Sequence, residues 1–170
     1  MKSKIYYDKI AKGYNELYGK EQLNKWGVVK QITDFSKKDI ILDLGSGTGI
    51  ILPELSKKVK FVFAVDNSIR MLTKSPKLEN VKYVLADAEK LPFQDKYFDK
   101  TISLTMLQDV KEWDAVLKEI SRVTREKAVI TFLKRNKNIN DVKKKIEKHF
   151  KIEKFIEEEK DFIFLVKNLH

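Results

Sequence analysis

Residues 39–55 contain the pattern that most restricts the fold of this chain: an apolar run, an acid, and then three closely spaced glycines. The run "DIILDLG" has β-branched residues near its start and suits a strand buried on both faces. Gly45, Gly47 and Gly49 follow, although the whole chain has only six glycines. Glycine inside a regular element costs up to about 1 kcal/mol, so this cluster indicates a loop that needs glycine. A loop between a buried strand and a helix brings a ligand against bare backbone and free N–H groups.

Two phosphate-binding loops do not match these glycines. A dinucleotide-binding loop has the spacing G-x-G-x-x-G, which would require its third glycine at position 50. Ile50 stands there, so recognition of a diphosphate by that loop is disfavoured. The P-loop is excluded as well, because no Lys-Ser or Lys-Thr pair follows the glycines.

Strand-like and helix-like segments alternate along most of the chain. Apolar runs predict strands at residues 39–45, 60–66, 80–87, 97–105, 127–133, 151–158 and 161–168. Helices are predicted at residues 3–19, 21–36, 67–75, 112–123 and 139–150, with a further short helix after the glycine loop. This alternation predicts one α/β domain over residues 1–170, with a mostly parallel, seven-stranded sheet and helices on both faces. The tight turn between the last two strands predicts that the last strand runs antiparallel.

An acid ends each of the first three predicted strands: Asp43, Asp66 and Asp87. Ligands of open parallel sheets bind beyond the carboxyl ends of the strands. Because these acids recur at one edge of the sheet, we expect a polar ligand to lie across that edge.

The composition restricts both location and chemistry. The chain has no cysteine, which excludes disulfides, thiolate metal sites and cysteine nucleophiles. It has no apolar run of about 18 residues, and its first residues lack the apolar centre of a signal peptide. We therefore expect a cytoplasmic protein that does not cross a membrane. The many lysines and acids are typical of a thermophile, although an AT-rich genome also favours lysine.

Positive charge is concentrated near the two ends of the chain. The formal net charge is +10 at pH 7, and residues 127–154 hold ten basic side chains against three acids. Such a stretch can attract nucleic acid. A solvated, lysine-rich helix explains the same pattern equally well. RNA binding through residues 127–154 is therefore one of two interpretations that the sequence leaves open.

Four motifs, in order, resemble the class I S-adenosylmethionine-dependent methyltransferases, in particular the small single-domain enzymes of methyltransferase type 11. "LDLGSGTG" is similar to the glycine loop of that family, and "VFAVDNSIRML" to its second-strand segment. "ADAEKLPFQDKYFD" is similar to its third-strand acid and the following loop, and "EISRV" to the segment before the fifth strand. The similarity extends from "YYDKIAKGYNELY" to the final hairpin. It implies a Rossmann-like fold, S-adenosyl-L-methionine as the cofactor, and methyl transfer as the reaction.

The resemblance also implies which residues bind the cofactor. The glycine loop would let the methionine moiety and the ribose approach the backbone. Asp43 would receive the ammonium group, and Asp66 would accept both ribose hydroxyls, since one carboxylate has two oxygens for a vicinal diol. The adenine would lie near Met71 and Asp87. The full set of expected cofactor-binding residues is Tyr14, Asp43, Gly45, Ser46, Gly47, Gly49, Asp66, Asn67, Met71, Asp87, Ala88 and Leu104.

Several of these assignments have alternatives. Asp66 also suits a helix cap, and Met71 suits ordinary core packing. Residues 1–36 would cover the cofactor site, with residues 37–170 as the Rossmann-like core. Tyr14 is implied to fold over the methionine end, with three other N-terminal tyrosines as competitors: Tyr6, Tyr7 and Tyr18.

Methyl transfer from a sulfonium needs few catalytic side chains. Displacement at a sulfonium methyl group needs alignment and exclusion of water, and a base only when the acceptor must lose a proton early. Residues after the fourth strand face the acceptor in this family, which makes Gln108 and Asp109 the candidate catalytic residues. Asp109 also suits the acidic start of a helix. Relatives often have histidine near position 108, whereas this chain has Gln108, so an imidazole base is not expected here. A metal site is not expected either.

The acceptor is narrowed by motifs that are missing. "SLTM" stands where methyltransferases of adenine or glutamine nitrogen have "NPPY" or "DPPY". After the fifth strand, "KRNKNIN" is too short for the acceptor lid that small-molecule enzymes often have. We therefore expect a large acceptor such as RNA, especially tRNA, with a small molecule as the alternative. A second hypothesis is a cofactor-binding subunit that is active only with a protein partner.

Overall fold

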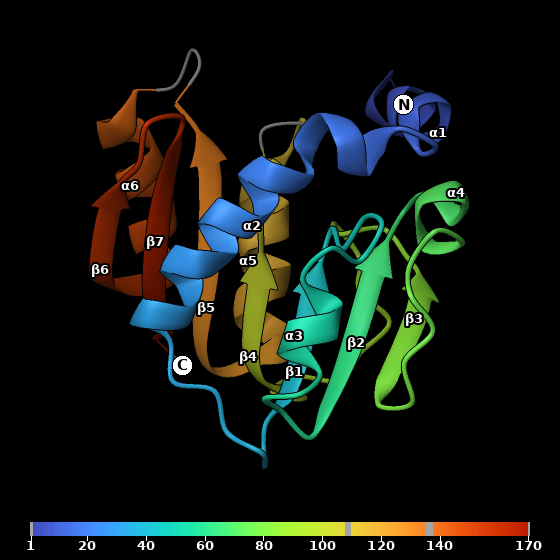
Figure 1. The fold of residues 1–170 in the computed structure, drawn as a ribbon. Coiled ribbons are helices and arrows are strands. Elements are labelled where there is room, and N and C mark those ends of the chain that lie inside the picture. The colour runs from blue at the N-terminus through green and yellow to red at the C-terminus, as the bar shows by residue number, and fades with distance from the viewer. Residues whose placement is uncertain (1, 108–109, 135–137, 170) are drawn as a thin grey trace.

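The computed structural model describes residues 2–107, 110–134 and 138–169, which include one seven-stranded sheet with helices on both sides (Figure 1). The strands are β1 (Ile40–Leu44), β2 (Phe61–Asp66), β3 (Val81–Leu85), β4 (Phe98–Ser103), β5 (Thr124–Leu133), β6 (Phe150–Glu157) and β7 (Asp161–Asn168). They lie in the order β3-β2-β1-β4-β5-β7-β6. Strands β1 to β5 pair in parallel, whereas β7 is antiparallel to both of its neighbours. The predicted Rossmann-like fold class is thus confirmed.

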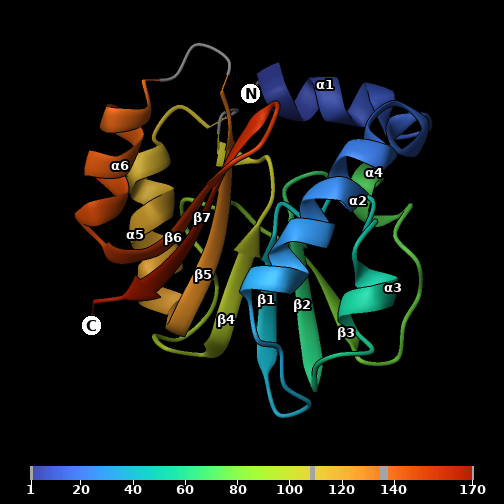
Figure 2. The same cartoon turned by 60° about the vertical axis from the view of Figure 1, so that its left-hand side comes forward.

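The helices divide between the two faces of the sheet. They are α1 (Lys2–Ile10), α2 (Tyr14–Ile32), α3 (Leu52–Leu55), α4 (Ile69–Leu72), α5 (Trp113–Val123) and α6 (Ile139–Glu147). Helices α2 and α3 cover one face, and α5 and α6 cover the other (Figure 2). Helix α1 lies across the carboxyl ends of the parallel strands, beside α4. None of the helices in the described residues is both long enough and apolar enough to cross a membrane.

Two apolar cores result, one on each face of the sheet. Alternate residues of a strand point to opposite faces, so Ile41 of β1 joins the core under α2 and Leu42 joins the core under α5. Trp26 and Val29 fill the first core from α2. Both cores reach the carboxyl ends of the strands, where Leu44 belongs to one core and Leu104 to the other.

The N-terminal helices differ from the prediction. Residues 3–19 and 21–36 were expected as two helices with a break near Gly19, but the break lies at residues 11–13 and α2 runs through Gly19. A glycine costs about 1 kcal/mol inside a helix, and the burial of Trp26 and Val29 outweighs that cost. The expected helix at residues 67–75 is shorter as well, since only Ile69–Leu72 is helical.

Candidate active site

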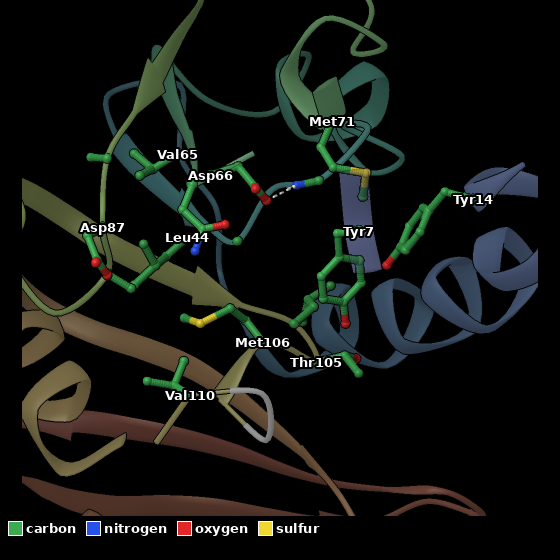
Figure 3. A pocket seen from close by; sticks show the side chains of 16 residues that line it. Tyr7, Tyr14, Leu44, Val65, Asp66, Met71, Asp87, Thr105, Met106 and Val110 are labelled. Carbon is green, nitrogen blue, oxygen red and sulfur yellow. Dashed lines mark hydrogen bonds between the residues drawn. The ribbon is translucent and has the colours of Figure 1, made fainter. Parts of the chain in front are cut away.

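A pocket opens at the carboxyl end of the sheet, where β1, β2 and β4 end (Figure 3). It encloses about 680 Å³ of space, which includes open solvent at its mouth. Strand ends such as Leu44 and Val65 form its floor. Tyr7 from α1 and Tyr14 from α2 line it from the other side. Elements that are far apart in the sequence therefore enclose one space.

The glycine loop presents bare backbone to this pocket. Gly45 has a φ of 76° and Gly47 a φ of 55°, in the left-handed region that favours glycine. The amide of Gly45 donates to the carbonyl of Val65 at 2.8 Å, which fixes the loop to the end of β2. A Cβ on Gly45 would lie 2.6 Å from Cγ of Met106, and a Cβ on Gly47 would lie 3.2 Å from Cε of Met71. Only glycine fits this approach without displacing those methionines.

Asp66 stands at the end of β2 and is held by backbone amides. Its Oδ2 accepts from the amide of Gly47 at 2.9 Å, and its Oδ1 accepts from the amide of Ser68 at 2.8 Å. Burial raises the pKa of Asp66, and these amide hydrogen bonds oppose the rise. Each carboxylate oxygen retains a second lone pair for a ligand hydroxyl. The residue that caps α4 is Ser68, whose hydroxyl accepts from the amide of Met71.

Asp43 is a buried carboxylate beside a second cavity. It is 3% exposed, and its Oδ2 has no hydrogen-bond partner among the described residues. Burial, together with the negative charge of Asp66, raises the pKa of Asp43 to about 7. The second cavity encloses about 320 Å³, open solvent included, and it shares Tyr14, Gly45 and Leu104 with the first. An orphaned buried carboxylate at the meeting of two cavities suits a ligand that carries a positive charge.

The N-terminal helices are bonded to the sheet around the pocket. The hydroxyl of Ser68 donates to Asp8 of α1 at 2.5 Å, and the hydroxyl of Thr48 donates to Asn15 of α2 at 2.5 Å. The rings of Tyr7 and Tyr14 meet edge to face, with centroids 6.2 Å apart. Residues of 1–36 thus form part of the pocket wall.

Nine of the twelve residues expected to bind cofactor line the main pocket: Tyr14, Gly45, Gly47, Asp66, Asn67, Met71, Asp87, Ala88 and Leu104. Asp43 and Ser46 line the second cavity. Gly49 lines neither of the two, because it packs on Leu52 and Pro76 behind the loop. The candidate catalytic residues Gln108 and Asp109 lie outside the described residues.

Several lining residues were not among the expected set. They are Leu44, Val65, Ala86, Met106 and Val110. Tyr7, which also lines the pocket, was named only as a competitor of Tyr14. Three of the unexpected residues stand next to a strand-end acid in the sequence, namely Leu44, Val65 and Ala86. The acids could therefore have indicated that these neighbours also line the site. Met106 and Val110 carried no comparable signal, because their place depends on how the segment after β4 turns. Among the described residues, no three His, Cys, Asp or Glu side chains are arranged to hold a metal ion.

Comparison with known proteins identifies the family. The family model described as a methyltransferase domain matches residues 42–132. The uncharacterized protein MJ1252 of Methanocaldococcus jannaschii is 34% identical over 143 residues, which are 82% of this chain and 53% of that protein. This chain spans about half, or less, of the length of the curated relatives it matches.

Solved structures share the fold at lower identity. A chain of the complex between the Haloferax volcanii Trm112 methyltransferase activator and a methyltransferase superposes with a TM-score of 0.86 at 13% identity, covering 96% of this chain and 98% of that one. A SAM-dependent methyltransferase from Aquifex aeolicus superposes with a TM-score of 0.73 at 21% identity, covering 84% of this chain and 88% of that one. The family match, the strand order and the pocket at the glycine loop agree. This chain belongs to the class I S-adenosylmethionine-dependent methyltransferases.

Proposed function

We propose that this domain binds S-adenosylmethionine across the two adjoining cavities and directs its methyl group to an acceptor. One observation carries the proposal: three strand-end carboxylates, those of Asp43, Asp66 and Asp87, lie around the exposed backbone of the glycine loop. Asp43 binds the ammonium group, Asp66 the ribose hydroxyls, and Asp87 with the Ala88 backbone the adenine edge. In this arrangement each of the three carboxylates accepts hydrogen bonds from a different part of the cofactor.

The residues of the chain orient the reactants and exclude water. When bound, S-adenosylmethionine would supply a methyl group on a positively charged sulfur. An acceptor lone pair would bond to the methyl carbon, in line with the carbon–sulfur bond that breaks and leaves its electrons on the sulfur. Tyr7 and Tyr14 offer ring faces and hydroxyls beside the methionine end, and such rings attract cations. Met106 and Leu104 close the pocket on the β4 side with apolar surface. Gln108 and Asp109 remain the proposed residues at the acceptor entrance.

RNA, especially tRNA, is the acceptor class that we favour, because the charge of the chain is strongly positive. Part of the basic stretch at residues 127–154 has internal contacts: Lys143 lies 4.2 Å from the ring centre of Phe155, and Lys145 lies 4.3 Å from that of Trp113. Lys144 and Lys148 of the same region are exposed. These exposed lysines are the side chains that we expect to meet phosphates, with a small molecule as the alternative acceptor.

A partner protein is a second candidate requirement for activity. The favouring observation is the Haloferax volcanii methyltransferase, whose chain superposes with this one and was solved in complex with the Trm112 activator. On this chain, Leu85 at the end of the edge strand β3 is 54% exposed, and it is the side chain that we expect at such a contact. Leu107, in contrast, is fully buried and offers no such surface.

Two assays on the purified chain test these proposals. Calorimetric titration with S-adenosylmethionine, and with its demethylated product, measures whether the pocket binds. Incubation with unmodified tRNA and a labelled methyl donor then measures transfer, with and without an added Trm112-type activator. Binding with transfer to tRNA supports the first proposal. Binding without transfer until the activator is added supports the second, and no binding by a folded chain contradicts the cofactor site.

A further inference from the structure

Lys25 is a buried cation that joins three parts of the fold. Its side chain is 3% exposed, and its ammonium group lies 3.0 Å from Oε1 of Glu21 and 2.9 Å from Oδ2 of Asp161. It also donates to Oγ1 of Thr105 at 2.5 Å. These partners belong to α2, to the start of β7 and to the segment after β4. The ammonium group has three N–H donors, and the hydroxyl of Thr105 accepts the one that the two carboxylates leave unpaired.

Thr105 has a backbone conformation that its side chain disfavours. Its φ is 56°, in the left-handed region, where a β-branched residue is a strong exception. Such conformations persist where surrounding contacts hold them, and they concentrate at functional sites. The amide of Thr105 donates to Oγ1 of Thr131 at 2.7 Å, and its hydroxyl accepts from Lys25. The backbone and the side chain of Thr105 are thus each held by a separate partner.

This turn determines the shape of one pocket wall. Thr105 and its two neighbours, Leu104 and Met106, all line the main pocket. Figure 3 shows Met106 and Thr105 together on the side of the pocket away from Met71. Met106 packs so closely on the glycine loop that a Cβ on Gly45 would lie 2.6 Å from its Cγ. A change of backbone at Thr105 would therefore move Met106 relative to the loop.

We propose that Lys25 is a positioning residue for the acceptor-side wall of the pocket. By holding the hydroxyl of Thr105, it maintains the left-handed turn that sets Met106 against the glycine loop. This inference rests on the proposed function, because the methyl acceptor would face this wall only if the pocket binds S-adenosylmethionine. The competing explanation is that Lys25 only ties α2 to β7 through Asp161, with Thr105 as a bystander.

Methionine methyl NMR distinguishes the two explanations. The chain has three methionines, and Met71 and Met106 line opposite parts of the pocket, so ¹³C-methyl labelling reports each wall separately. Lys25→Gln should shift the Met106 signal and leave that of Met71 in place. The matched control is Lys30→Gln on the same helix, which breaks the 2.7 Å ion pair with Glu54 and should shift neither signal.

A double-variant comparison strengthens the test. Thr105→Val removes the acceptor of the Lys25 bond, so the combination with Lys25→Gln should move Met106 no further than Thr105→Val alone. Additive shifts, or an unmoved Met106 signal in folded Lys25→Gln, would overturn the proposal. Should Lys25→Gln fail to fold, Thr105→Ser decides, because its retained hydroxyl should keep the wild-type Met106 signal that Thr105→Val loses. Equal shifts in these two variants would also overturn it.

Failure of this inference and failure of the proposed function give different results. Adding S-adenosylhomocysteine to the wild-type chain should shift both pocket methionine signals. If it shifts neither, the cofactor site is wrong, whatever the Lys25 variants do. In an acceptor assay that the wild-type chain supports, Thr105→Val should lower kcat by about 10- to 100-fold, because misplaced groups lose alignment. Its cofactor Kd should rise by a smaller factor than kcat falls, since Met106 moves while the residues proposed to bind ribose and ammonium are unchanged.

Discussion

Replacing Asp43 by asparagine should make the ligand-free protein less sensitive to rising pH. Burial and the charge of Asp66 raise the pKa of Asp43 from 3.8 to about 7. The folded state therefore binds the Asp43 proton more tightly than the unfolded state does. The stability that this tighter proton binding contributes is fully present below pH 3.8, the ordinary pKa of the carboxyl. That contribution is lost as the pH rises toward 7. Each pH unit in this window costs about 1.4 kcal/mol, and the whole shift amounts to about 4 kcal/mol.

Urea unfolding near pH 5 and near pH 8 measures this effect. The wild-type protein should lose about 3 kcal/mol more than Asp43→Asn between those two conditions, since about two units of the window lie between them. Comparing the two pH values within each protein cancels the pH-independent cost of burying an amide. If both proteins respond equally to pH, the pKa of Asp43 is not raised and the reasoning fails.

The same carboxyl should make cofactor binding depend on pH. If Asp43 receives the ligand ammonium, it must be ionised in the complex, so affinity should rise between about pH 5.5 and 7 by up to about tenfold per unit. Titrations in buffers of different ionisation enthalpy should detect proton release on binding. Asp43→Asn should bind more weakly and without this pH dependence. A wild-type affinity that is constant over the range contradicts the assignment.

Two further predictions concern the glycine loop and the basic helix. Gly45→Ala should lower the free energy of unfolding by about 1–3 kcal/mol in urea, because alanine disfavours φ 76° and its Cβ meets Met106. The control Gly27→Ala, in α2 with open space around the new Cβ, should instead stabilise by up to about 1 kcal/mol; a loss as large as that of Gly45→Ala would refute the conformational argument. Reversing the charge of Lys144 and Lys148 should weaken tRNA binding and reduce its salt dependence by about one unit of slope per lost phosphate contact. Cofactor affinity should not change, and unchanged tRNA binding would make α6 a solvated face.

The fold and most of the pocket could be predicted because their signals are local. An apolar run that ends in an acid identifies both a buried strand and a ligand-facing side chain, as at Asp66. The glycine spacing specifies the loop that follows β1 in the same way. Because parallel strands align their carboxyl ends, these separate local signals meet in one place without further information.

The remaining features depend on contacts between distant residues. Helix α2 continues through Gly19 because burial along this helix outweighs the cost of the glycine. Gly49 was expected in the cofactor site by resemblance to the family, and it lines neither of the two cavities described above. Lys25 resembles any other lysine of a charged helix in the sequence, and its partner Thr105 is 80 positions away. No periodicity or motif predicts such a pair.

The most direct test of the account is calorimetric titration of S-adenosylhomocysteine into the wild-type chain and into Asp66→Ala, measured side by side. The wild-type chain should bind with a Kd of about micromolar order, which corresponds to a binding free energy of about 8 kcal/mol. Asp66→Ala should bind about 30-fold more weakly, which is the loss of about 2 kcal/mol expected for two charge-assisted hydrogen bonds to the ribose. Equal affinity in the two folded proteins, or no binding by the folded wild-type chain, would contradict the proposed cofactor site.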